Sequence, residues 1–172
     1  MATIVPITPA LASGYRDALD AVAHERKYLS SLEAPPRERS EAFVTANIAA
    51  GNPHFVALVD DLVVGWCDIY RDSHPWAQHV GLLGMGVLAD FRGQGIGQRL
   101  ITSALDAART AGFGRVQLEV YANNLPAIAL YEKVGFAHEG RRRNAMHLPD
   151  GYCDLLIMGQ LFPALANPQA VG

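Results

Sequence analysis

The apolar residues near the N-terminus recur at intervals of three and four, which is typical of one buried face of a helix. A strand over "TIVPI", residues 3–7, precedes this pattern, and the proline-rich segment "EAPPRER" ends it. A second helix is predicted over residues 37–50, with Phe43 and Ile48 facing inward and Gly51 ending it. The first apolar repeat consists of Leu11, Tyr15, Leu19 and Val22.

The middle of the chain changes to runs of β-branched and aromatic residues. "HFVALVDDLVVGWCDIY", residues 54–70, predicts two strands that are joined by a turn at Asp60 and Asp61. "AQHVGLLGMGVL", residues 77–88, predicts a third strand, so that the three would form an antiparallel meander. Glycine within a strand often marks a bulge or a close backbone approach, and the glycines at 84 and 86 therefore favour a bulge.

The remaining patterns predict two more helices and three more strands. A helix over 95–111 is followed by a strand over 115–121 and a short helix over 124–135. A hairpin of strands 136–147 and 152–162 closes the chain across the turn "PDG". The element order β-α-α-β-β-β-α-β-α-β-β predicts an α/β (α+β) fold, in which helices pack on a mixed sheet.

Length and composition favour one folded domain. The 172 residues, half of them apolar and 18% charged, have the profile of an ordinary globular protein. No repeat or linker interrupts residues 1–162, which are therefore predicted to form a single domain. The last segment, "PALANPQAVG" at 163–172, is expected to be a flexible tail.

Charge and cysteine content exclude several classes of function. A net charge of −3 argues against a nucleic-acid binder, although it is compatible with a small anionic ligand. Cys67 and Cys153 have no CxxC spacing and no histidine cluster nearby, so no metal site is expected. Two free cysteines, no signal peptide and no apolar run long enough to span a bilayer indicate a cytoplasmic protein without a membrane partner.

The segment "ADFRGQGIGQRL", residues 89–100, places three glycines where a helix is predicted to begin. Unpaired backbone N–H groups and the helix dipole make such a start a phosphate site, and glycine lets a diphosphate approach the backbone. The sequence is not a P-loop, because Gly97 is followed by Gln98 and Arg99, and G-x-G-x-G fits the dinucleotide fingerprint poorly. The alternative is that these glycines only form a tight turn.

Two blocks of sequence resemble the signatures of one known family. "RGQGIG", residues 92–97, is similar to the R/Q-x-x-G-x-G/A motif of the GCN5-related N-acetyltransferases (GNAT), and "LEVYANNLPAIALYEKVGF", residues 118–136, is similar to their second signature. The order and spacing of the blocks, and the predicted element order, agree with this family along nearly the whole chain. The resemblance implies the GNAT fold, with a mostly antiparallel sheet of about seven strands and helices on both of its faces.

The resemblance also implies the reaction, which is transfer of acetyl from acetyl-CoA to a primary amine by direct attack. A small amino acid or related amine is the expected acceptor, and no metal is required. The alternatives are a protein N-terminal acetyltransferase like those of ribosomal proteins, or a non-catalytic acyl-CoA-binding module. Because relatives are often dimeric and "LLIMGQLF" at 155–162 is apolar, a homodimer is a further expectation.

Several site residues follow from the resemblance. In relatives, successive amides of the glycine motif hold the pyrophosphate, and the strand that here contains Met85 and Val87 splays from its neighbour to bind the pantetheine arm. Asn124 matches a residue that contacts this arm, or it only caps a helix. Tyr131 matches the general acid or hydrogen-bond donor toward the CoA sulfur, or it is a packed aromatic residue. The expected cofactor-binding residues are Met85, Val87, Arg92, Gly93, Gln94, Gly95, Ile96, Gly97, Gln98 and Asn124.

The general base depends on the amine. A lysine-like amine with a pKa of about 10.4 must lose a proton at a cost of about 4–5 kcal/mol at neutral pH, whereas an α-amine costs about 1–1.5 kcal/mol. Glu119 lies twelve residues before Tyr131, as does a base proposed in the ribosomal-protein branch, although it is also consistent with a solvated or structural carboxylate. Water, His79 and Asp68 are the other possibilities.

The acceptor pocket of this fold lies among the first two helices, their loop and the closing hairpin. The segment "HERKYLSSLEAPP" therefore suggests Glu25, Tyr28 and Glu33 as substrate-binding residues, although glutamates in such a segment are more commonly surface charges of a helix.

Overall fold

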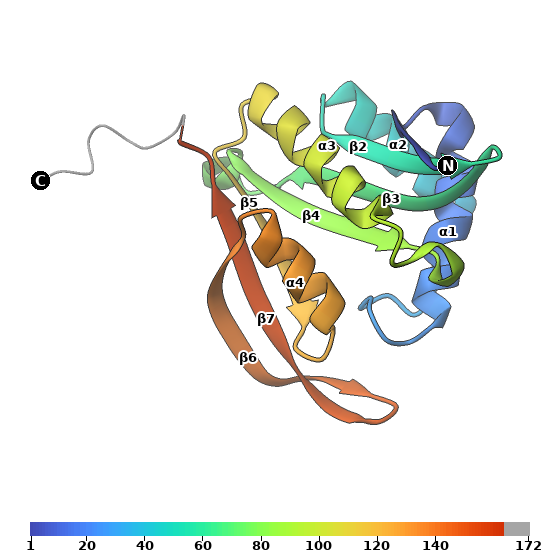
Figure 1. Cartoon of the computed structure of the whole chain (residues 1–172). Coiled ribbons are helices and arrows are strands. Elements are labelled where there is room, and N and C mark those ends of the chain that lie inside the picture. The colour runs from blue at the N-terminus through green and yellow to red at the C-terminus, as the bar shows by residue number, and fades with distance from the viewer. Residues whose placement is uncertain (164–172) are drawn as a thin grey trace, which may run out of the picture.

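A seven-stranded sheet forms the centre of the computed structural model, which describes residues 1–163 (Figure 1). The strands follow the order β1-β2-β3-β4-β5-β7-β6, and every adjacent pair is antiparallel except β4 and β5. The predicted order of strands and helices is confirmed. The strands are β1 (Thr3–Pro6), β2 (His54–Val59), β3 (Leu62–Arg71), β4 (Val80–Val87), β5 (Arg115–Tyr121), β6 (Ala137–Leu148) and β7 (Gly151–Leu161).

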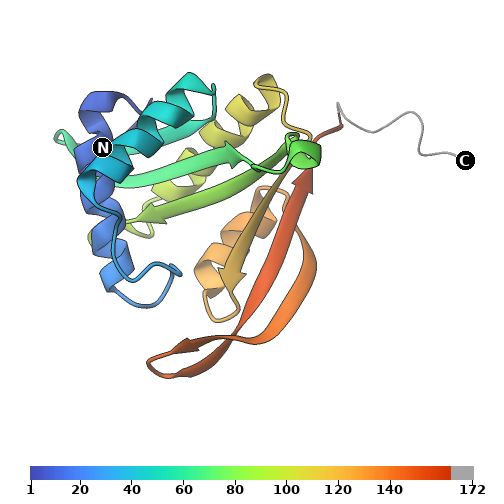
Figure 2. The ribbon, with the colours of Figure 1, turned by 180° about the vertical axis from the view of Figure 1, so that it is seen from behind.

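In the described part of the chain, four α-helices cover the two faces of the sheet. The helices α3 and α4 lie on one face, and α1 and α2 lie on the other, as the two opposite views show (Figures 1 and 2). The closing hairpin of β6 and β7 extends beyond the helices at one end of the sheet. The helices are α1 (Ala12–His24), α2 (Arg37–Ala49), α3 (Ile96–Thr110) and α4 (Leu125–Lys133).

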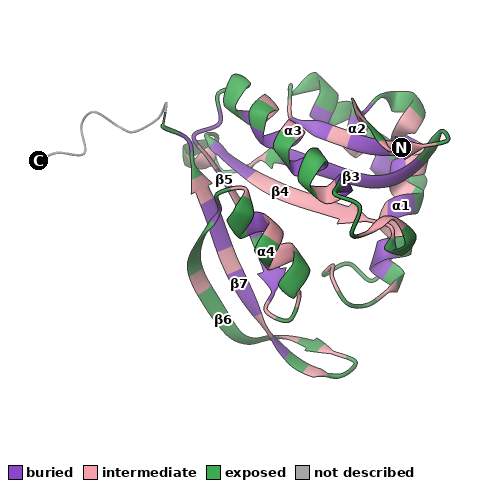
Figure 3. Cartoon of the chain, viewed as in Figure 1, coloured by how far each residue is buried: buried purple, intermediate pink, exposed green. Residues whose placement is uncertain are grey.

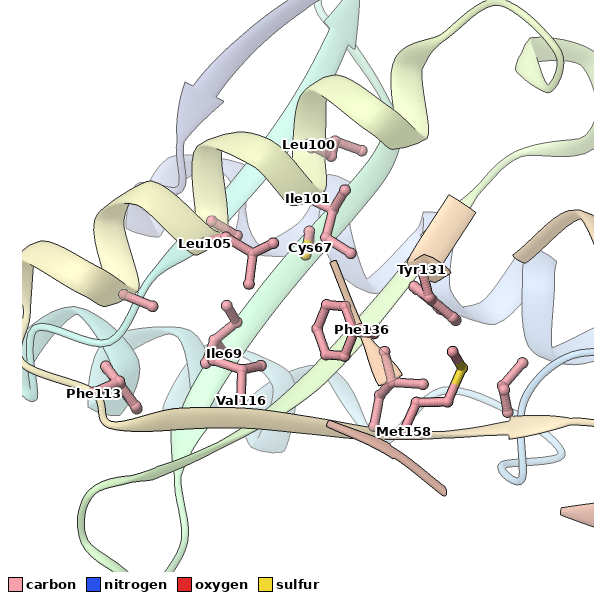
Figure 4. Close-up of a cluster of buried hydrophobic side chains, with 14 of the residues drawn as sticks. Cys67, Ile69, Leu100, Ile101, Leu105, Phe113, Val116, Tyr131, Phe136 and Met158 are labelled. Carbon is pink, nitrogen blue, oxygen red and sulfur yellow. The ribbon is translucent and has the colours of Figure 1, made fainter. Parts of the chain in front are cut away.

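Each face of the sheet has its own hydrophobic core because side chains alternate along a strand. Cys67, Ile69 and Val116 pack against α3 (Figure 4). On the other face, Trp66 packs against α1, and its ring centroid lies 6.0 Å from that of Tyr15. The remaining predicted members of the apolar face of the first helix, Leu11, Leu19 and Val22, lie in this second core.

One core prediction for α2 is wrong. Ile48 is 44% exposed, whereas Val44 is fully buried and Phe43 is half-buried against α1. The helix turns Val44 and Asn47 toward the sheet, and the position four residues after Val44 therefore points partly into solvent.

The predicted hairpin turns are confirmed. Val59 pairs with Leu62 across Asp60 and Asp61, which have φ values of 47° and 63°. Two successive positive φ angles are characteristic of the type I′ turn, whose twist matches that of the flanking strands. The closing hairpin turns at Pro149 and Asp150, because Leu148 pairs with Gly151.

The central feature for function is that β4 and β5 pair over only three residues. Val80–Leu82 pairs with Arg115–Gln117, and beyond these residues the two parallel strands separate. The residues of β4 beyond the pairing are only partly buried, whereas β3 beside them is almost entirely buried (Figure 3). The predicted splay is therefore present.

The predicted bulge in β4 is absent from its ladder with β3, whose register runs without a shift from Gly65–Val87 to Arg71–Gly81. The glycines serve close approach instead. The ring of Trp66 occupies the space in which a Cβ of Gly86 would lie, and the carboxylate of Asp68 lies beside Gly84.

The C-terminal tail, the membrane and the homodimer were the subjects of three further expectations. The predicted tail at 163–172 lies, apart from Pro163, outside the described residues, and the domain boundary at 162 stays a prediction. None of the helices in the described part of the chain has the length and apolarity to cross a membrane. The homodimer also stays a prediction.

Candidate functional site

The glycine loop forms a backbone cradle at the start of α3. Gly93 and Gly95 have φ values of 73° and 76°, a region that L-residues adopt only with strain. Helix α3 starts at Ile96, and its first backbone bond runs from the N–H of Arg99 to the carbonyl of Gly95 at 3.2 Å. The N–H groups of residues 96–98 therefore have no helical partner and are available to an anion. A Cβ at Gly93 or Gly95 would meet no atom within 4 Å, so the space in front of the cradle is open.

Arg92 connects this loop to β4 and to the end of α1. Its Nε donates to the carbonyl of Val87 at 2.8 Å, and its two terminal nitrogens donate to the carboxylate of Glu25 at 2.9 and 2.5 Å. The guanidinium lies over the ring of Tyr28, 4.7 Å from its centroid. The hydrogen bond to Glu25 raises the pKa of Arg92. Glu25 was expected to bind the substrate amine, but its carboxylate instead pairs with the guanidinium of Arg92.

The backbone of β4 offers hydrogen-bonding groups to the gap beside β5. The N–H of Leu88 bonds to the carbonyl of Val64, and the carbonyl of Val80 accepts from Asp72, each at 2.9 Å. Because these groups alternate along an antiparallel strand, the even-numbered residues face β3 and the odd-numbered ones face the gap. Beyond the paired segment, the N–H groups of residues 83, 85 and 87 therefore point toward the separated β5.

A cavity of about 650 Å³ passes through this gap between the strands. It extends from the glycine loop and α4 on one face to the loop after α1 on the other. Twelve of the fifteen residues predicted for the site line it, although they come from six separate segments. They are Tyr28, Met85, Val87, Arg92, Gly93, Gly95, Ile96, Gly97, Gln98, Glu119, Asn124 and Tyr131.

The other three predicted residues lie outside the cavity lining. The side chain of Gln94 is exposed and donates to the carbonyl of Asp90 at 3.2 Å. Glu33 is exposed in the loop between α1 and α2, and Glu25 faces Arg92. The structure therefore brings nine of the ten predicted cofactor residues together at the cavity, but only Tyr28 of the three predicted acceptor residues.

Tyr131 lies in α4 with 8% of its surface exposed, and its ring centroid is 5.9 Å from that of Phe136 (Figure 4). Burial, with a smaller contribution from Cys67, raises the pKa of the phenol. Tyr131 therefore keeps its proton at neutral pH and is a hydrogen-bond donor at the cavity wall. Asn124 caps the same helix, since its side-chain oxygen accepts from the N–H of Ala127 at 3.4 Å.

The two proposed carboxylate bases lie in different environments. Glu119 is exposed on β5 and forms an ion pair with Arg142 of β6. Asp68 is 4% exposed on β3, and burial raises the pKa of its carboxyl to about 7. The third possibility, His79, is exposed just before β4, at the end where β4 still pairs with β5.

Part of the cavity wall was not predicted from the sequence. Leu29 and Ser30 line the side that faces α1, and Met146 and Leu155 of the closing hairpin line it as well. The hydroxyl of Tyr121 donates to the carbonyl of Leu29 at 3.1 Å and so connects β5 to the loop after α1. These residues belong to no motif, so the sequence could indicate them only through the position of their segments after the first helix and in the closing hairpin.

Within residues 1–163, no group of three or more His, Cys, Asp or Glu side chains is arranged to hold a metal ion. A glycine cradle at a helix start, beside a sheet opened between two parallel strands, instead defines a class of site suited to an extended ligand with a diphosphate. Residues 19–136 match the model of the Acetyltransferase (GNAT) family. The chain belongs to this family.

Curated relatives match the chain over part of their length. The [Ribosomal protein bS18]-alanine N-acetyltransferase of Escherichia coli K12 is 39% identical over 77 residues, which are 45% of this chain and 52% of that protein. N-alpha-acetyltransferase 30 of Schizosaccharomyces pombe is 32% identical over 88 residues, or 51% of this chain and 59% of that protein. The chain thus spans about half the length of the curated relatives it matches.

Solved structures confirm the predicted GNAT fold. An acetyltransferase of the GNAT family from Streptococcus pneumoniae has a TM-score of 0.87 at 24% identity, and the match covers 94% of this chain and 100% of that one. The structure of yncA from Salmonella typhimurium, solved with its cofactor acetyl-CoA, has a TM-score of 0.90 at 18% identity and covers 98% of both chains.

Proposed function

We propose that this protein is an acetyl-CoA-dependent N-acetyltransferase that acetylates a primary amine of a small molecule, such as an amino acid or a related amine. The observation that carries the proposal is the cavity through the split sheet, which has the glycine cradle at one end and Tyr131 in its wall. Membership in the GNAT family supports the reaction class.

The residues present fit acetyl-CoA, which supplies an activated acetyl group as a thioester when bound. The N–H groups of residues 96–98 and the open space before Gly93 and Gly95 suit its pyrophosphate. The main-chain groups of Met85 and the N–H of Val87 suit the amides of its pantetheine arm, whereas the carbonyl of Val87 already accepts from Arg92. Asn124 also lines the cavity.

Tyr131 acts in this proposal as the hydrogen-bond donor to the sulfur of CoA. Its raised pKa disfavours complete transfer of the phenolic proton to a thiolate whose conjugate acid has a pKa of about 8.5. A neutral donor in a buried site nevertheless stabilises a developing thiolate, because the surrounding dielectric is low. Within the described residues, Phe136 packs beside the ring and helps to fix its orientation.

The acceptor side of the cavity suits a compact amine. The hydrogen bond between Tyr121 and the carbonyl of Leu29 holds the loop after α1 against β5. The ion pair between Glu119 and Arg142 connects β5 to the closing hairpin on the same side. Both contacts hold neighbouring segments together on this side, which favours a compact amine over a polypeptide. On its spacing to Tyr131, Glu119 remains a proposed base, although its charge is already matched by Arg142.

A protein N-terminal acetyltransferase is the second candidate, because two relatives are named as acetyltransferases of a ribosomal-protein alanine and of N-alpha groups. A CoA-release assay separates the candidates when free amino acids, polyamines and aminoglycosides are compared with short peptides that carry free N-termini. The first proposal predicts turnover with one class of free amine and little with peptides. Efficient turnover with peptides alone would overturn the first proposal in favour of a protein N-terminal acetyltransferase.

A further inference from the structure

The carboxylate of Asp68 is buried on the acceptor side of the sheet without a cation. Asp68 is 4% exposed, and it lies opposite His54 of β2 and Gly84 of β4. Among the described residues, no hydrogen bond or ion pair to its carboxylate is present, and burial is the single cause of its raised pKa. A buried carboxylate costs several kcal/mol unless a cation or hydrogen-bond donors satisfy it. The carboxyl of Asp68 therefore either keeps its proton or needs a cation from outside the chain.

Gly84 leaves this carboxylate next to the cavity. The two carboxylate oxygens of Asp68 lie 3.4 and 3.6 Å from the place where a Cβ of Gly84 would be. Gly84 itself lines the cavity, two residues beyond the last pair that β4 forms with β5. Asp68 itself does not line the cavity, but because Gly84 has no side chain, a small group placed above Gly84 would come within reach of the oxygens of Asp68.

Among residues 1–163, no cationic side chain contributes to the pKa of Asp68. The titratable groups around it are His54 from β2, Tyr15 from α1 and Tyr70 from its own strand, and Glu119 lies on β5 beyond the segment that pairs with β4. Burial lowers the pKa of His54 to about 4, so its ring is neutral at pH 7. Glu119 is a second carboxylate, although Arg142 pairs with it, and it is the unpaired carboxyl of Asp68 that favours a cationic ligand.

We propose that Asp68 binds the ammonium group of the acceptor above Gly84 and takes up its proton before acetyl transfer. This inference rests on the proposed function and deepens it, because it assigns the base and restricts the substrates to amines that are cationic at neutral pH. One N–H bond of the ammonium breaks, and the proton passes to a carboxylate oxygen of Asp68. The electron pair stays on the nitrogen, which becomes the nucleophile, and the proton leaves Asp68 for solvent after transfer.

The first test is the pH dependence of kcat/KM for Asp68→Asn, measured with an active amine of lysine-like pKa, about 10.4. The wild-type protein is expected to give a bell-shaped profile, with an acid limb near the pKa of Asp68, about 7, and an alkaline limb at the pKa of the amine. In Asp68→Asn the acid limb disappears, and kcat/KM at pH 7 falls about 100-fold or more. Asp106→Asn, an exposed aspartate on α3, is the matched control and keeps the wild-type profile.

Gly84→Ala provides a second test that leaves Asp68 in place. Its Cβ would have ordinary contact distances to the carboxylate, so the fold tolerates it, but it fills the space between Asp68 and the cavity. The KM of the amine is expected to rise about tenfold, whereas acetyl-CoA affinity is unchanged because the N–H and carbonyl of Gly84 face β3. Gly140→Ala on β6, where a Cβ also meets only ordinary contacts, is the control with unchanged kinetics.

The outcomes separate this inference from the proposed function. The role of Asp68 is overturned if the wild-type protein is active and the Asp68→Asn variant keeps both the acid limb and the rate. If the acid limb is lost in Glu119→Gln instead, the base is Glu119. If Asp68→Asn does not fold, an unchanged KM in Gly84→Ala overturns the inference and a raised KM supports it. A wild-type protein that acetylates no amine overturns the proposed function and this inference with it.

Discussion

Replacing Gly95 by alanine separates the fold of the glycine loop from its binding of acetyl-CoA. Gly95 has a φ of 76°, and an L-residue in this region is strained by about 1–2 kcal/mol. For a chain of this size the melting temperature should fall by about 2–8 °C. No atom of the protein lies within 4 Å of the new Cβ, so no steric clash within the chain adds to this loss.

The effect on acetyl-CoA should be larger, because the new Cβ projects into the open space at the cradle. Each hydrogen bond between a backbone N–H and a charged phosphate contributes about 1.5–3 kcal/mol. The loss of one such bond weakens binding by about ten- to a hundredfold. Calorimetric titration with acetyl-CoA at a temperature well below the melting transition measures this change directly.

Gly112 offers a matched control at the other end of α3. It has a φ of 79°, and a Cβ there would also meet nothing within 4 Å, but it lies outside the cavity. Gly112→Ala should lose about the same stability as Gly95→Ala, about 1–2 kcal/mol, and keep the acetyl-CoA affinity of the wild-type protein. Equal affinities in Gly95→Ala, Gly112→Ala and the wild type would refute the assignment of the loop as the pyrophosphate site.

Three further predictions follow from the core and the site. Tyr131→Phe should lower kcat more than the affinity for acetyl-CoA, and an equal loss in both, measured by steady-state kinetics and calorimetry, would contradict its role as a donor. Gly86→Ala should destabilise the protein by about 1–3 kcal/mol in urea unfolding, because the Cβ overlaps the buried ring of Trp66, and a variant as stable as Gly140→Ala would show that this contact does not matter. Asp68→Asn should raise the melting temperature at pH 8, since a carboxyl whose pKa is raised to about 7 contributes stability at low pH that is lost as the pH rises through this value. The gain should shrink toward pH 4, and a gain independent of pH would mean that the buried carboxyl does not titrate in this range.

The sequence predicted those features that depend on neighbouring residues. The turn at Asp60 and Asp61 and the start of α3 near Gly95 both have positive φ angles that glycine and aspartate tolerate better than most residues. The apolar repeat of the first helix also reached the core. Most of the predicted residues that line the cavity could be named because they lie in two continuous motifs, residues 92–97 and 118–136, whereas Met85 and Val87 lie in neither motif.

Other features depend on residues that the fold brings together from far apart. Glu25 was expected to face the substrate, but it pairs with Arg92, which lies 67 positions later. The prediction of a bulge at Gly84 and Gly86 is wrong, because these glycines instead leave room for the side chains of Asp68 and Trp66 on the adjacent strand. These contacts do not follow from local spacing. The register between β3 and β4 sets the contacts of the two glycines, and the packing of α1 sets the ion pair of Glu25 with Arg92.

In the proposed function, acetyl is transferred from acetyl-CoA to an amine in the cavity through the split sheet. The most direct test incubates the protein with acetyl-CoA and each amine of the panel, and measures the released CoA thiol and the acetylated product by mass spectrometry. The proposed function predicts that both appear in equal amounts and only when a suitable amine is present. Tight binding of acetyl-CoA without any acetylated product across the panel would contradict it and indicate a non-catalytic binding module.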